Sequence, residues 1–185
     1  MKKTVIFVLA LALVLPLFCG CGGKSVEEST SAAVERILTC TLDEVKAYYD
    51  MREFLGDVTV AENGTPQFES DAGMVEVVGE MEDYIAKRFG AYMTEKCLEQ
   101  MTSDRLFVQV YMLADANGSG IEPKDLTLTR REGEHEVWDF TAELMATKDG
   151  SSVSPVSGTV VMKQDGGEWK ADNISVGVHD LPLGK

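Results

Sequence analysis

Positive charge and histidine are both scarce in this sequence. Lysine and arginine together number 17 against 31 acidic residues, so the formal net charge is -14 at pH 7. Nucleic-acid binding needs a basic face that pairs with phosphates, so this balance argues against a DNA- or RNA-binding protein. It also argues against adhesion to anionic lipid through charge. The two histidines, His135 and His179, have no cysteine or second histidine at ligand spacing, which argues against a zinc site.

The chain also lacks an apolar run of the roughly 20 residues that a transmembrane helix requires. Its longest apolar run covers residues 5–18, follows Lys2 and Lys3, and is typical of the central region of a signal peptide. Gly20 and Cys21 come soon after this run. The sequence therefore predicts an export signal at the N-terminus.

The residues after this run, Phe18-Cys19-Gly20-Cys21, resemble the lipobox of bacterial lipoproteins. In that motif a small residue precedes a cysteine that is lipidated and becomes the new N-terminus; Phe18 stands where leucine is usual. The resemblance implies a signal peptide over residues 1–20, a lipid on Cys21, and anchorage at the extracytoplasmic face of the bacterial cell membrane. The alternatives are plain secretion and anchorage by an uncleaved segment.

The remaining chain has the composition of a globular domain. It is 44% hydrophobic and 26% charged, which excludes wholesale disorder, collagen and coiled coil. Residues 21–30 are small and polar, and they predict a flexible tether. Residues 31–185 show neither an internal repeat nor a composition break, so we expect one domain there.

The first half of this domain has the periodicity of helices. Apolar residues recur at three- and four-residue steps around residues 34–38 and again over residues 74–92. Thr41 with Glu44 three positions later fits a capping box, which predicts that a short helix begins there. A further short helix is expected over residues 95–101, and a loop over the turn-rich residues 56–70.

The second half has the alternation of strands. Segments with a period of two cover residues 106–113, 126–129, 138–144, 156–163 and 168–178, with Asp165-Gly166-Gly167 as a hairpin turn. Helices followed by such a meander predict an α+β fold. We therefore expect N-terminal helices packed on a curved antiparallel sheet of about five strands.

Two short segments carry a resemblance to a known superfamily. They are Tyr92-Met93-Thr94-Glu95, and the closing hairpin with Gly167-Glu168-Trp169-Lys170-Ala171-Asp172. Together with the expected N-terminal helices, these segments resemble the nuclear transport factor 2-like superfamily, the cone-shaped α+β fold shared with ketosteroid isomerase. The likeness would cover roughly residues 31–180. It implies a domain that many surface lipoproteins carry without an assigned activity, or alternatively an isomerase- or dehydratase-like enzyme that uses a pocket carboxylate.

Two groups of side chains are candidates for such a site. Asp139, Thr141 and Glu143 lie on one face of an expected strand, and a carboxylate lining an apolar cone could move protons. The simpler interpretation, which we favour, places these carboxylates in solvent and Trp138 against the helices. Five aromatic residues could line a small cavity or be ordinary core: Tyr48, Tyr84, Tyr92, Tyr111 and Trp138.

Asp115, Asn117 and Ser119 resemble the opening of an EF-hand calcium loop. The bidentate glutamate is missing, because Leu126 stands at the twelfth position. A hairpin loop needs the same residue types for its backbone, so we assign no metal here.

Cys40 and Cys97 are the cysteines left after Cys21. Export favours a disulfide between them, with two buried thiols as the alternative.

These observations predict a lipid-anchored extracytoplasmic protein whose domain acts as a non-catalytic binding or interaction module. We assign neither a catalytic residue nor a cofactor. Besides the membrane, the partner is a small molecule, an envelope polymer or a protein. The alternatives are the cone-fold enzyme and a calcium- or envelope-polymer-binding module.

Overall fold

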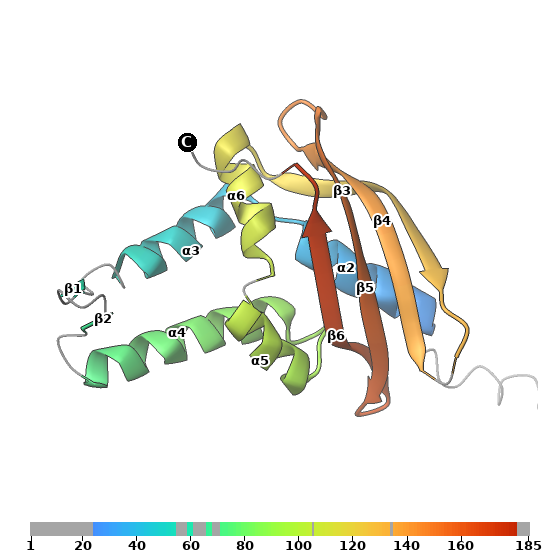
Figure 1. Cartoon of the computed structure of the whole chain (residues 1–185), viewed down its shortest axis with the longest axis horizontal. Coiled ribbons are helices and arrows are strands. Elements are labelled where there is room, and N and C mark those ends of the chain that lie inside the picture. The colour runs from blue at the N-terminus through green and yellow to red at the C-terminus, as the bar shows by residue number, and fades with distance from the viewer. Residues whose placement is uncertain are drawn as a thin grey trace, which may run out of the picture.

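The computed structural model describes residues 24–54, 59–60, 66–67, 71–104, 106–133 and 135–180. In this part of the chain the α+β class is confirmed, with five helices packed against a four-stranded antiparallel sheet (Figure 1). The strands follow chain order as a meander: β3 (Ile121–Arg130), β4 (Glu136–Ala146), β5 (Ser152–Asp165) and β6 (Glu168–Val178). A separate pair of two-residue strands joins β1 (Thr59–Val60) to β2 (Pro66–Gln67).

One face of the sheet is filled with apolar side chains. Along β4 the buried residues alternate with half-buried or exposed ones, as the period-two pattern predicts. Phe140 lies opposite Gly158 of β5, and a β-carbon added at Gly158 would collide with the Phe140 ring and with the Ser175 carbonyl oxygen. Glycine at this position therefore leaves room for the Phe140 ring. The apolar face is packed with Trp138, Phe140, Leu144, Val160 and Ile174.

The hairpin between β5 and β6 forms as the sequence predicts. Asp165 pairs with Glu168, and Gly166 and Gly167 between them have φ angles of 60° and 90°. Two successive residues with positive φ make the tight turn that matches the twist of the strands, and glycine adopts them without strain. The hairpin therefore gives β6 a fixed starting point.

Helix α2 (Val26–Leu38) lies across the apolar face and contacts all four strands of the sheet (Figure 1). Ser25 caps it, because its hydroxyl accepts from the Glu28 backbone at 3.1 Å while the Glu28 carboxylate accepts from the Ser25 backbone at 2.8 Å. The tether predicted over residues 21–30 is therefore too long. Its second half is the first turns of α2, and Thr30 is already buried.

The second capping box was predicted correctly. The Glu44 backbone N–H donates to the Thr41 hydroxyl at 3.2 Å, and the Glu44 carboxylate accepts from the Thr41 backbone at 3.0 Å. Helix α3 (Leu42–Phe54) begins at this cap. Helices α4 (Asp71–Phe89) and α5 (Glu95–Asp104) follow, and Figure 1 shows α3 and α4 running away from the sheet.

The fifth predicted strand, over residues 106–113, is wrong. These residues enter helix α6 (Val108–Asn117). Its buried residues are Val110, Tyr111, Leu113 and Ala114, and with buried Phe107 at the N-cap they recur at helical spacing. The alternation seen in the sequence had little meaning, because nearly every residue from 106 to 113 is apolar, and such a run fits a strand and a buried helix equally well.

Candidate functional site

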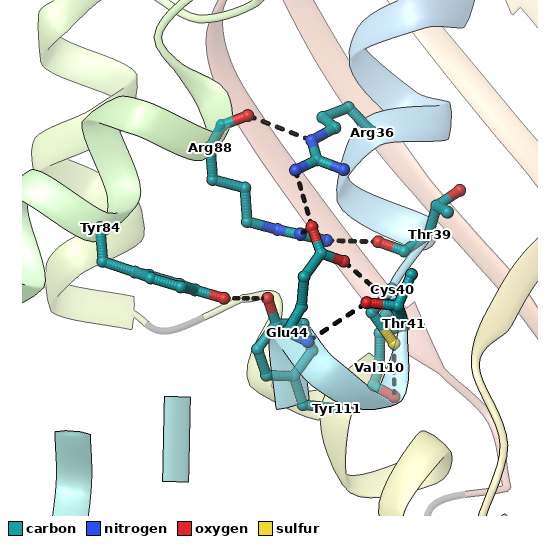
Figure 2. Close-up of polar contacts among 9 residues, drawn as sticks. All are labelled: Arg36, Thr39, Cys40, Thr41, Glu44, Tyr84, Arg88, Val110 and Tyr111. Atoms are coloured by element: carbon teal, nitrogen blue, oxygen red, sulfur yellow. Dashed lines mark hydrogen bonds and ion pairs between the residues drawn. The ribbon is translucent and has the colours of Figure 1, made fainter. Parts of the chain in front are cut away.

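A charged cluster lies where the ends of α2 and α4 meet the start of α3 (Figure 2). Arg88 forms an ion pair with Glu44 and donates to the carbonyl of Thr39. Arg36 reaches the same carboxylate oxygen of Glu44 at 3.0 Å and donates to the Arg88 carbonyl at 3.1 Å. The Arg88 side chain is 4% exposed, so the cluster holds a guanidinium inside the helical layer.

Aromatic rings complete the surroundings of Arg88. Its guanidinium carbon lies 5.1 Å from the centre of the Phe89 ring and 5.4 Å from that of Tyr111. The hydroxyls of Tyr84 and Tyr111 share a hydrogen bond (Figure 2). Burial raises the pKa of both tyrosines and lowers the pKa of Arg88. The cluster therefore stabilises a buried cation by one carboxylate and by ring faces.

This helix-end cluster, made of Arg36, Glu44, Arg88 and the two tyrosines, has little capacity for chemistry. The thiol beside it is Cys40, and burial raises the pKa of that thiol to about 11. A thiol with such a pKa stays protonated at neutral pH, whereas reactive cysteines have lowered pKa values. We interpret the cluster as the structural junction of three helices.

An open cavity of about 400 Å³ lies elsewhere, at the end of the layered structure near the β5–β6 hairpin. We call it the end cavity. It forms between the start of α2, the turn that links α4 to α5, and the start of β6. Its walls include Lys24, Ser29, Ala32, Tyr92, Glu168 and Trp169.

Backbone pairing fixes the walls of the end cavity. The Ala171 N–H of β6 donates to the Tyr92 carbonyl at 2.9 Å, and the Thr94 N–H donates to the Ala171 carbonyl at 2.9 Å. Trp169 pairs with Gln164 in the β5–β6 ladder. Both aromatic walls therefore belong to the sheet or to a segment paired with it, and their backbones are held in place.

The five aromatic residues proposed to line a cavity lie in three different places. Tyr48, Tyr84 and Tyr111 come together around Phe107, with ring centres 5.4 Å apart for Tyr48 and Tyr111 and 5.2 Å apart for Phe107 and Tyr111. These three belong to the packed core. Trp138 is buried on the sheet, and Tyr92 lines the end cavity.

The carboxylates of β4 lie away from the helices. Asp139 accepts hydrogen bonds from the Arg131 guanidinium at 2.6 and 2.8 Å and from the Thr159 hydroxyl at 2.9 Å. The hydrogen bonds from Arg131 hold the pKa of Asp139 below its usual range. A carboxyl group that acts as an acid catalyst in an apolar pocket needs a raised pKa instead. The favoured interpretation, with Trp138 inside and the carboxylates outside, agrees with this placement.

The segment that resembles a calcium loop is the end of α6. Asp115 and Asn117 are helical, and the Asn117 amide donates to the Leu113 carbonyl at 2.8 Å. Gly118 caps the helix with a φ of 56°, where the sequence had suggested a loop between two strands. The described residues hold no group of three or more potential metal ligands. Within the same residues, none of the helices is long and apolar enough to cross a membrane.

The disulfide expected between Cys40 and Cys97 is absent, because both are free thiols. Cys40 pairs with Ile121 of β3 through two backbone hydrogen bonds of 2.9 Å, and its sulfur lies 4.0 Å from the Val110 carbonyl. Cys97 lies in the first turn of α5, a helix packed on β6. The two cysteines therefore belong to different parts of the core.

Sequence reasoning missed the helix-end cluster and most of the end cavity. One signal was present: Arg88 follows Met81 and Ile85 along the apolar stripe of α4, next to Phe89. A cation on the side of a helix that faces the core needs a buried partner of opposite charge. Lys24, Glu168 and Trp169 carried no such signal, because they come together only when the hairpin meets α2.

Comparisons with protein-family models, curated proteins and solved structures found no match for this chain.

Proposed function

We propose that this chain is a lipid-anchored extracytoplasmic binding module whose ligand occupies the end cavity. One observation carries the proposal: a cavity of about 400 Å³ brings two aromatic rings and two opposite charges together. This volume lies within the range of small-molecule sites, which combine apolar walls with a few convergent polar groups. The helix-end cluster, by contrast, is buried and internally paired.

The lipid anchor rests on the sequence motif around Cys21, and the position of the first cap indicates where the domain would lie relative to that anchor. Cys21 lies outside the described residues, while Ser25 begins the folded part as the cap of α2. Three residues of extended chain reach at most about 10 Å. A lipid on Cys21 would therefore hold Lys24, and with it the end cavity, close to the membrane surface.

The alternatives have less support. The enzyme would need a carboxylate with a raised pKa in an apolar pocket, whereas the pKa of Asp139 is lowered by Arg131. The calcium module would need Asp115 in a loop, whereas Asp115 lies in α6. The relation to the nuclear transport factor 2-like superfamily stays a prediction, compatible with an α+β architecture.

Two measurements test the two halves of this proposal. Mass spectrometry of the membrane fraction should find mature protein that begins at Cys21 with a diacylglycerol thioether. Cys21→Ser should release or misprocess the protein, because the lipid supplies the anchor. An unmodified N-terminus at another residue would contradict the anchor.

For binding, a photo-crosslinking benzoylphenylalanine is placed in living cells at position 91, which lines the end cavity and is exposed. Position 141, exposed on the opposite face of the sheet, serves as the control. We expect a defined adduct at position 91 that is absent at position 141 and is lost in Glu168→Gln. Equal labelling at both positions, or none, would contradict a ligand in the end cavity.

A further inference from the structure

Lys24 and Glu168 line the same cavity, and neither forms a salt bridge with another described residue, although Lys24 interacts electrostatically with Glu28. Their neighbours behave differently. Lys170 binds Asp165 at 3.2 Å, and Lys96 binds Asp172 at 3.0 Å, so nearby charges do find partners. The cavity thus holds one cation just before α2 and one anion at the start of β6, an arrangement that suits a ligand that carries both charges.

The aromatic walls add a preference for the positive end. Tyr92 and Trp169 are both half-buried, and their backbones are fixed by pairing with β6 and β5. Aromatic faces beside a carboxylate attract ammonium groups, quaternary ones above all. Neither the Tyr92 hydroxyl nor the Trp169 indole N–H is bonded to another described residue, so both remain available to a ligand.

We infer that the end cavity binds a small zwitterion. Glu168, Tyr92 and Trp169 take its ammonium group, and Lys24 with the Ser29 hydroxyl takes its phosphate or carboxylate. The inference rests on the proposed binding function and names its ligand class. Two sources supply this chemistry: the headgroup of a zwitterionic phospholipid, and a free compound of the same kind.

The test uses ¹⁹F NMR of the lipidated protein labelled with 5-fluorotryptophan, in nanodiscs made of phosphatidylglycerol. The chain has two tryptophans, so one spectrum contains a reporter and its internal control. Phosphocholine is the probe, and choline and inorganic phosphate are titrated separately. We expect phosphocholine to shift the Trp169 signal while the signal of buried Trp138 stays in place.

Two variants separate the two ends of the ligand. Glu168→Gln should weaken both phosphocholine and choline by about tenfold, because it removes the negative charge that attracts the quaternary ammonium group. Lys24→Gln should weaken phosphocholine by a similar factor and leave choline unchanged. Glu122→Gln and Lys124→Gln, exposed charge changes on β3, are the matched controls and should change neither. Calorimetry on the wild-type protein without the fluorine label repeats the phosphocholine titration as an independent measurement.

A second set of nanodiscs distinguishes the sources. In phosphatidylcholine discs, loss of the phosphocholine response means that the bilayer headgroup already fills the cavity. An unchanged response assigns the cavity to the free compound, and both results support a zwitterion. The inference is overturned if phosphocholine leaves Trp169 unmoved in phosphatidylglycerol discs, or binds no better than choline. Crosslinking at position 91 would then show whether the cavity holds another ligand or none.

Discussion

Arg88 of α4 and Glu44 of α3 form an ion pair inside the helical layer (Figure 2), near the ends of these two helices that lie toward the sheet (Figure 1). The Arg88 side chain is 4% exposed and that of Glu44 is 28% exposed. Arg36 contacts the same carboxylate. One acidic side chain thus compensates two cations at the point where three helices meet.

Glu44→Gln should destabilise the protein strongly, because it leaves a buried guanidinium without its counter-ion. Removing one partner of a buried pair costs about 3 kcal/mol or more. Urea unfolding measures the loss. Asp50→Asn breaks the exposed pair with Lys46 on the same helix and should cost less than about 0.5 kcal/mol. Equal losses in the two variants would show that the Arg88–Glu44 pair contributes no more than a surface contact.

Gly158→Ala should destabilise the sheet, because its new methyl group would collide with the Phe140 ring and the Ser175 carbonyl. We expect a loss of about 1–3 kcal/mol in the free energy of unfolding, typical of overpacking. Gly177→Ala is the control on the neighbouring strand, since its closest new contact is an ordinary 3.6 Å from the Ser157 carbonyl. Thermal unfolding of both variants tests this expectation. Similar melting temperatures for Gly158→Ala and Gly177→Ala would refute the steric argument.

Asp172 links β6 to the start of α5. Its carboxylate accepts from Lys96 at 3.0 Å and from the Thr94 hydroxyl at 3.1 Å, and these bonds lower its pKa. A lowered pKa means that the stabilisation is present above the ordinary aspartate pKa of about 4 and is lost as the pH falls through the folded-state value.

Asp172→Asn should therefore lower stability at pH 7 and flatten the decline of unfolding free energy below about pH 4. Urea titrations at several pH values measure the slope. Glu122→Gln, which removes an exposed carboxylate, should leave the decline almost as steep as in the wild type. A slope that is unchanged in Asp172→Asn would remove Asp172 from the acid response.

Cys40 and Cys97 should be unreactive in the folded protein. Burial raises their pKa values to about 11 and about 12, so little thiolate forms at pH 8. With Cys21 replaced by serine in the mature protein, a thiol reagent should label neither residue in buffer and both in urea. If protein unfolded without reductant shows no free thiol, the two cysteines form a disulfide after all.

Local patterns in the sequence determined the Thr41 cap and the hairpin. Thr41 with Glu44, and Asp165 before two glycines, form the predicted structures because their contacts lie within four residues of each other. The strand pattern of β4 also predicted correctly which side chains face the helices. The cap and the hairpin depend on backbone conformation over a few residues, and the strand pattern depends on which face is buried. A short stretch of sequence is enough to predict each of them.

Tertiary structure decided the rest. Residues 108–113 become part of a helix because their place in the core buries the side that carries Val110 and Tyr111, a choice that an almost wholly apolar run leaves open. Arg88 is stabilised in the interior by Glu44, which a different helix supplies. The end cavity joins Lys24 to Trp169, residues at opposite ends of the described chain. Contacts across such distances depend on how whole elements pack, and no local pattern encodes them.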